Sequence, residues 1–347
     1  MTKRATTSAV VAGLLAVLAL LAAGCGGSGN DAAGTTETTA ATGIKVGLIT
    51  DLGQLNDNGF NELAFNGLKR AEKELGIQGR VVESASAADY IPNMTTLARQ
   101  GYDLIIGVGY AQGNAIAAAA KAFPNTKFAI VDVDQATLKG KPANVQGLLF
   151  REQQVGYLVG YLAALEAKRA GADSISAVGG FKEPPVDRYI AGYRAGALAA
   201  VPGTKVKWGY SQDWDDQTKC KELALNQIAG GSRVVFQVAG GCGLGALLAA
   251  KQAHVWGIGV DADQSFLGPH VLTSALKGVD SAVFLTIKAA QDGTFAGGGN
   301  ATFGLDQDGV GLGKFSANAN KSDIEATEKV EKQIAGGEIK DIPTTVS

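Results

Sequence analysis

Histidine is nearly absent from the 347 residues, and the chain has only three cysteines and two methionines. The two histidines, His254 and His270, have no cysteine or histidine companions at metal-ligand spacing, so no metal site is predicted. The sequence also lacks the G-x-S-x-G motif that carries the nucleophile of serine hydrolases. The glycines at 107–113 are not followed by the lysine of a phosphate-binding loop. We therefore predict no catalytic residue and no cofactor.

Neither sign of charge dominates, because 31 basic residues face 33 acidic ones for a net charge of −2. Hydrophobic residues make up 46% and charged residues 18% of the chain. This balance excludes a disordered polyelectrolyte and gives no basis for nucleic-acid binding. At this length the chain can bury one large core or two moderate ones.

Long apolar runs are missing after the N-terminus, since no later segment reaches 18 uncharged apolar residues. The segment 1–24 differs from the rest of the chain. Lys3 and Arg4 precede an apolar and small-residue run from Ala9 to Ala23, which Gly24 and Cys25 close. This pattern predicts an export signal over residues 1–24.

Residues 21–25, LAAGC, resemble a bacterial lipobox, in which the cysteine receives a lipid. The resemblance implies lipidation (diacylglycerol, palmitate) of Cys25. The usual leucine position is held by Ala22, with Leu21 one residue further back, so an ordinary signal peptide with an incidental cysteine is the alternative. Residues 25–43 have almost no bulky apolar side chain and predict a flexible tether.

If Cys25 is lipidated, Cys220 and Cys242 remain as an even pair. An exported chain meets an oxidising compartment, which favours a disulfide between them. Two buried thiols are the alternative.

From residue 45 onward, short apolar runs alternate with longer helical stretches, which predicts parallel α/β sheets. The first half has strand candidates separated by helices near 59–75, 91–100 and 113–122. The strand candidates are residues 45–50, 79–84, 103–109 and 127–134.

The pattern then begins again with a helix near 152–168. Strands are expected at 174–180, 205–210, 233–240 and 254–261, with helices between them. We expect an N-terminal lobe of residues 44–150 plus about 273–297, and a C-terminal lobe of 151–272 plus about 298–347. The crossovers are expected near 149–151, 273–276 and 295–299. Two such lobes leave a cleft at the carboxyl ends of their strands, where open α/β sheets bind ligands.

Polar and aromatic residues gather at these strand ends. They are Asp51, Asn56, Asp57, Phe60 and Asn61 after the first strand, Asp132 or Asp134, Trp214, and Asp261. A carboxylate can accept from two sugar hydroxyls while aromatic faces cover a flat base, a combination that suits a nucleoside. Turn and helix-cap roles for the Asn and Asp residues, and a packing role for Phe60, are the structural alternatives.

A competing motif is the G-x-G-x-x-A pattern at 241–246, which is followed by Asp261 at the end of the next expected strand. On spacing alone it fits a dinucleotide-binding loop. Its place in the second half of an exported chain argues against that use. We expect its glycines to admit a ligand near the backbone and to direct the start of a helix at the cleft.

Several segments together resemble the basic membrane protein family, whose members include purine nucleoside receptor lipoproteins of ABC transporters. The resemblance covers roughly residues 44–340. Its main segments are Thr50–Gly53 with Asn56–Asn61, Gln153–Gly160, Gly179–Gly180 with Pro185–Val186, and Ile258–Gln264 with Thr273–Lys277.

The resemblance implies a type I periplasmic-binding fold of two doubly wound lobes with a hinge. It implies that Asp51, Asn56 and Asp57 face a base and that Phe60 stacks on it. Asp132 would lie on the same lobe, Asp261 would hold ribose hydroxyls, and Lys277 would lie beside Asp261. Trp214 stands where the family usually has a phenylalanine, and a surface role for Lys277 is its structural alternative.

The function that follows is an extracytoplasmic, membrane-anchored, monomeric binding protein. It would deliver a nucleoside to an ABC permease and its ATPase without acting as an enzyme. A sensor that presents the ligand to a membrane receptor is one alternative, and an exported nucleoside-processing enzyme is another.

Overall fold

The computed structural model describes residues 43–346. The predicted signal peptide, the Cys25 lipidation site and all but the last residue of the tether lie outside the described residues. Among the residues described, none of the helices combines the length and apolar character needed to cross a bilayer.

The first sheet has six parallel strands in the spatial order β11-β5-β4-β3-β1-β2. They are β1 (Lys45–Ile49), β2 (Gln78–Val82), β3 (Leu104–Gly107), β4 (Lys127–Val131), β5 (Val145–Phe150) and β11 (Asn300–Phe303). The order reverses at β1, which makes the sheet doubly wound. Strands β3 and β4 are almost wholly buried, as expected for parallel strands covered on both faces.

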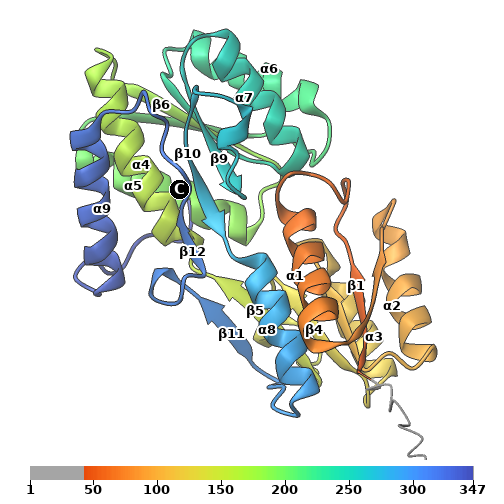
Figure 1. The fold of residues 1–347 in the computed structure, drawn as a ribbon. Coiled ribbons are helices and arrows are strands. Elements are labelled where there is room, and N and C mark those ends of the chain that lie inside the picture. The colour runs from red at the N-terminus through yellow and green to blue at the C-terminus, as the bar shows by residue number, and fades with distance from the viewer. Residues whose placement is uncertain (1–42, 347) are drawn as a thin grey trace, which may run out of the picture. The chain divides into compact units, whose positions relative to one another are not determined.

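Helices cover both faces of this sheet. They are α1 (Phe60–Leu75), α2 (Tyr90–Arg99), α3 (Gly113–Ala122) and α8 (Val279–Gln291). Figure 1 shows α8, in light blue, beside α1, in orange, although the two helices lie far apart in the sequence. Gly67 of α1 permits this approach, because a Cβ there would meet the backbone of Asp280.

The second sheet repeats the same topology in the order β12-β10-β9-β8-β6-β7. Its strands are β6 (Ser174–Gly179), β7 (Lys205–Tyr210), β8 (Val234–Val238), β9 (Trp256–Asp261), β10 (Val271–Lys277) and β12 (Val310–Leu312). All its pairings are parallel except that of β12 with β10. Its helices are α4 (Glu152–Arg169), α5 (Pro184–Ala200), α6 (Gln217–Ala229), α7 (Gly243–Gln252) and α9 (Lys321–Ala335). The predicted α/β class with two doubly wound sheets is confirmed.

The lobe boundaries differ from the expected ones near the C-terminus. The expected N-terminal segment 273–297 begins inside β10, which pairs with β9 in the second sheet. The expected C-terminal segment 298–347 contains β11, which pairs with β5 in the first sheet. The buried run of β10 extends the second sheet before the chain crosses, so the observed crossovers are at 150–152, 277–279 and 303–310.

Helices α4 and α5 pack closely through glycines. A Cβ at Gly156 or Gly160 of α4 would strike the backbone carbonyl of Tyr189 or Tyr193 of α5. Gly196 of α5 has the reciprocal relation with Tyr157 of α4. The missing side chains therefore let the two helix backbones come together on one face of the second sheet.

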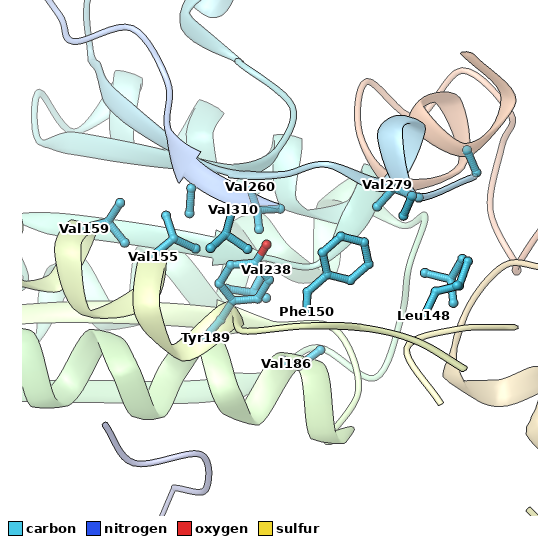
Figure 2. Close-up of a cluster of buried hydrophobic side chains, with 14 of the residues drawn as sticks. Leu148, Phe150, Val155, Val159, Val186, Tyr189, Val238, Val260, Val279 and Val310 are labelled. Atoms are coloured by element: carbon cyan, nitrogen blue, oxygen red, sulfur yellow. The ribbon is translucent and has the colours of Figure 1, made fainter. Parts of the chain in front are cut away.

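The main apolar cluster runs through the crossovers rather than ending at them. Figure 2 shows Leu148 and Phe150 of β5 near Val279 of α8 and Val310 of β12, all of them buried. Phe303 of β11 stacks against Phe150 with ring centroids 5.3 Å apart. The segments that join the sheets are therefore part of the hydrophobic core.

Cys220 of α6 is paired with Cys242, which immediately precedes α7, and their Cα atoms are 5.6 Å apart. This is the pairing expected from the sequence. Both residues are fully buried among the small side chains that separate α6 and α7 from the sheet.

Candidate ligand-binding site

A cavity of about 630 Å³, including its opening to solvent, lies at the carboxyl ends of strands from both sheets. Its lining includes eight of the nine predicted ligand-binding residues: Asp51, Asp57, Phe60, Asn61, Asp132, Trp214, Asp261 and Lys277. The fold therefore brings together side chains from distant parts of the sequence.

Asn56 is the one predicted ligand-binding residue that does not line the cavity. Its side chain is exposed in the loop between β1 and α1. The next residue, Asp57, is turned inward instead, because its carboxylate is used at the start of α1.

Asp57 and Asn61 hold the β1–α1 loop in place. The Asp57 carboxylate accepts hydrogen bonds from the backbone N–H groups of Gly59, Asn61 and Glu62 at 2.9, 2.9 and 3.3 Å. The Asn61 side-chain oxygen accepts from the backbone of Asp51 at 3.0 Å. The Asp57 bonds satisfy early amides of α1, so its capping role applies even though it faces the cavity. The Asn61 bond instead ties the helix start to the end of β1.

Asp51 follows β1 and points into the cavity. Its Oδ1 accepts from the Tyr90 hydroxyl at 2.6 Å and from the Leu52 backbone at 2.8 Å. A Cβ at Gly109 would fall on the Asp51 carboxylate, so glycine is needed there for space as well as for its φ of 107°. Burial raises the pKa of Asp51 to about 6, and the Tyr90 hydrogen bond opposes that rise.

Asp132 and Asp261 occupy equivalent positions in the two sheets. Asp132 directly follows β4 and Asp261 ends β9, and these strands have the same place in their respective sheet orders. Both residues adopt left-handed backbone conformations, with φ of 73° and 62°. Such conformations are uncommon for residues other than glycine and concentrate at functional sites.

Lys277 joins the sheets through a buried ion cluster. Its Nζ lies 2.7 and 2.8 Å from the two carboxylate oxygens of Asp132 and 3.0 Å from Oε1 of Glu152. The exposed fractions of Lys277, Asp132 and Glu152 are 3%, 5% and 0%. Arg188 also contacts Glu152, at 3.3 Å. The surface role considered for Lys277 is therefore wrong.

The charges of this cluster set the protonation of its members. Burial lowers the pKa of Lys277, but Asp132, Glu152 and Asp261 raise it more, so the ammonium stays protonated. Burial raises the pKa of Asp261 to about 7, while Lys277 lowers it and Asp132 and Asp57 raise it further. Asp261 also accepts a 3.3 Å hydrogen bond from Tyr189.

Aromatic rings line the cavity from both sheet sides: Phe60 and Trp214 were predicted from the sequence, and Tyr110 and Tyr189 also belong to the lining. Phe60 begins α1, and Lys277 Nζ lies 5.1 Å from the centre of its ring. Trp214 follows β7 and packs on Phe181 with ring centroids 5.4 Å apart. A Cβ at Gly180 would collide with the Trp214 ring, so the glycine lets this ring lie flat on the backbone.

The glycines of the G-x-G-x-x-A pattern have structural uses here. Gly241 lines the cavity together with Gly240, before α7 begins at Gly243. A Cβ at Gly243 would strike the Gln237 side chain, and one at Gly245 would strike the backbone of Gln217. Two of these glycines therefore serve packing around α7.

Glu183 and Tyr189 of the lining and Glu152 behind it were not predicted from the sequence. Glu183 lies in the loop after β6. Asp132 and Asp261 were predicted because polar residues that follow a strand lie at the ligand-binding edge of the sheet, and this strand-end rule applies to Glu183 as well. Tyr189 lies within α5, and an aromatic residue inside a helix predicts packing in the hydrophobic core. Glu152 gave no signal apart from its position at a crossover.

The family described as "ABC transporter substrate-binding protein PnrA-like" (Bmp) matches residues 44–342. The chain belongs to this family. The match spans both sheets and all three crossovers, and it confirms the resemblance found in the sequence.

Relatives of the family agree with this assignment. A CD4+ T-cell-stimulating antigen of Listeria monocytogenes is 35% identical, covering 85% of this chain and 87% of its own length. The "ABC transporter nucleoside-binding protein BmpA" of Lactococcus lactis is 34% identical, covering 89% and 92%. A solved ABC transporter solute-binding protein of Aeropyrum pernix superposes with a TM-score of 0.78 at 28% identity, covering 86% of this chain and 94% of that one. The type I periplasmic-binding fold is thereby confirmed.

Replacing Lys277 with methionine should lower the free energy of unfolding by about 3–5 kcal/mol, because it leaves Asp132 and Glu152 buried without their cation. Urea denaturation measures the change. The matched control is Lys205→Met, which removes an exposed ion pair with Asp173 and should cost less than about 1 kcal/mol. Equal losses in the two variants would contradict the role of the buried cluster.

The stability of the ligand-free protein should fall as pH rises from about 5 to 7. The folded state raises the pKa of Asp261 from 3.8 to about 7. It therefore binds this proton more tightly than the unfolded chain does and loses that advantage as the pH approaches 7. The contribution of Asp261 to the free energy of unfolding should change by about 2 kcal/mol over this window.

Melting temperatures measured across this pH window should show a flatter profile for Asp261→Asn than for the wild type. The exposed control Asp341→Asn should follow the wild type. Part of the slope should remain in Asp261→Asn, because the pKa values of Asp51 and Glu183 are also raised, to about 6 and about 7. A slope equal to that of the wild type would rule out a contribution from Asp261.

Proposed function

We propose that this family member is the lipid-anchored binding protein of an ABC importer and that it carries a purine nucleoside in the cavity between its sheets. The printed name of the Lactococcus lactis relative, a nucleoside-binding protein, supports this ligand class. Names of other relatives that include "lipoprotein" or "basic membrane protein" support the membrane location.

The observation that carries the proposal is the composition of the cavity wall. Phe60 and Trp214 supply aromatic faces from opposite sides, which suit a flat base. Asp261 and Lys277 supply an acceptor and a donor within one polar group, which suits ribose hydroxyls because each hydroxyl both donates and accepts. Nothing in this arrangement requires a covalent step.

The cavity is strongly acidic, which limits its ligands. In the part of the chain that the structure describes, the lining has one ammonium group, Lys277, and five carboxyl groups, those of Asp51, Asp57, Asp132, Glu183 and Asp261. A phosphate group placed among them would be repelled at low effective dielectric. The ligand is therefore an uncharged nucleoside rather than a nucleotide.

We further propose that the sheets belong to two lobes that close on the ligand by hinge motion at the three crossovers. One lobe comprises residues 44–150 and 279–303, and the other 152–277 and 310–335. A hydrogen bond from the Gln264 side chain to the Asn58 carbonyl, 3.2 Å long, joins the two sides of the cavity. It supports a closed arrangement in which both lobes contact the ligand.

Calorimetry with inosine, adenosine and guanosine tests the ligand. At least one should bind with a Kd in the micromolar range or below, and Asp261→Asn should weaken that binding at least tenfold. Asparagine is chosen because it tolerates the left-handed backbone at this position. The corresponding 5′-monophosphates should bind at least a hundredfold more weakly than the nucleosides.

The control variant is Asp263→Asn, a neighbouring carboxylate outside the cavity lining, which should keep wild-type affinity. The nucleoside recovered from the complex should be chemically unchanged, since the protein acts by binding alone. Failure of all three nucleosides to bind, or equal affinity in Asp261→Asn and wild type, would overturn the proposal.

Export of the chain makes a separate prediction about its cysteines. Intact mass of protein extracted from membranes should correspond to a chain that begins at Cys25 and carries lipid. Without reductant Cys220 and Cys242 should resist alkylation, and with reductant under denaturing conditions both should react. A chain cleaved elsewhere without lipid would refute the anchor, and two thiols that react without reductant in denaturant would refute the disulfide.

A further inference from the structure

Glu183 lines the cavity from the loop between β6 and α5. Its backbone carbonyl accepts from the Asp187 N–H at 2.9 Å, which fixes its place at the start of the helix. The adjacent cation, Lys182, is paired with Asp187 at 2.8 Å. Within residues 43–346 no hydrogen bond or ion pair engages the Glu183 carboxylate, which interacts with its neighbours only through longer-range charge effects.

These charge interactions divide the polar lining into two groups. Asp261 is influenced mainly by Lys277, Asp132 and Asp57, and this group includes the cavity's only ammonium among the described residues. Asp51, which holds the Tyr90 hydroxyl, and Glu183 form the other group, and Asp51 is the charge that acts most strongly on Glu183. Within the described residues neither of these two acids has an ion pair, because Lys277 is bound to Asp132 and Glu152 and acts on Glu183 only at longer range.

Asp51 and Glu183 approach the cavity from opposite sheets, one after β1 and the other after β6. Tyr90 already donates its hydroxyl hydrogen to Asp51. The remaining capacity of this group is therefore to accept hydrogen bonds, and a ligand between the two acids must bring donors for both. A ligand without them would cover the half-buried Glu183 carboxylate and leave it without a hydrogen-bond partner, which is costly.

Purine bases differ in the donors on one edge. Guanine has a ring N–H beside an exocyclic amino group, so its edge offers three hydrogens. Hypoxanthine has the same ring N–H but no amino group, and adenine sets an amino group beside a ring acceptor. A carboxylate that accepts from two adjacent donors while a second carboxylate accepts the third hydrogen matches guanine alone of the three.

We propose that Glu183 is a specificity-determining residue that acts with Asp51 to select a nucleoside whose base has an exocyclic amino group beside a ring N–H. This inference rests on the proposed function, because it assumes that a nucleoside occupies the cavity. Lys277 and Asp261 then meet the sugar, and the acid-only group meets the base.

Calorimetric titration of guanosine and inosine into the wild type, Glu183→Gln and Glu83→Gln tests the inference. The wild type should prefer guanosine at least tenfold. In Glu183→Gln the preference should fall below threefold, because Glu183, both of whose oxygens lack a partner in the described structure, would accept from the two adjacent donors of guanine, and the glutamine amide would set its N–H group against one of them. Glu83 is exposed and outside the cavity lining, so Glu83→Gln should keep the wild-type ratio.

Glu183→Asp, which keeps the charge, should keep a preference for guanosine, and all variants should melt within a few degrees of the wild type. If the wild type binds both nucleosides but Glu183→Gln leaves their affinity ratio unchanged, the role of Glu183 is refuted and the proposed function stands. The role is refuted equally if the wild type shows no preference. If neither nucleoside binds the wild type, both proposals fail.

Discussion

A single lysine, enclosed by carboxylates where the chain passes from one sheet to the other, is the constraint on which the rest of this structure depends. Lys277 ends β10 of the second sheet and contacts Asp132 of the first and Glu152 at the start of α4. Charges this deeply buried are tolerated only when they are paired, so the strand ends that meet there stay together, and any movement of one sheet against the other must turn about this point. The geometry of the cavity, which opens beside this cluster, follows from that requirement.

The two sheets share a short sequence as well as a topology. VDVDQ at 131–135 and VDADQ at 260–264 follow or end equivalent strands, and the first aspartate of each has a left-handed backbone. The copies have diverged in their contacts. Asp132 is bound by Lys277, whereas Asp261 accepts a hydrogen bond from Tyr189, its one side-chain partner within residues 43–346, and has a raised pKa. The same turn therefore positions Asp132 to bind Lys277 and connect the two sheets, and positions Asp261 as an acceptor that is available to a ligand.

Most elements could be predicted from the sequence, because alternating apolar strands and helices are local patterns. The predicted strand at 205–210 matches β7, and the predicted helix at 113–122 matches α3. The later lobe boundaries could not be predicted, since whether β10 joins one sheet or the other depends on pairing with distant strands. The strand-end rule correctly predicted Asp51, Asp132 and Asp261 as cavity residues, but it failed for Asn56, whose orientation depends on which neighbour caps α1. Glu152 could not be found in this way, because only the folded chain brings it to Lys277.

The late crossovers also affect how the chain is completed during synthesis. Strand β5 is buried, and its second neighbour is β11, which comes near the end of the chain. In the same way, β10 obtains its second neighbour only when β12 has been made. Until residue 312 has been made, at least one sheet therefore presents an unpaired hydrophobic edge, the kind of surface that invites pairing between chains. A fragment that stops before residue 300 has the cavity-forming strand ends, but β5 of the first sheet and β10 of the second each lack their outer neighbour. The topology of this chain therefore makes its truncated products prone to aggregate.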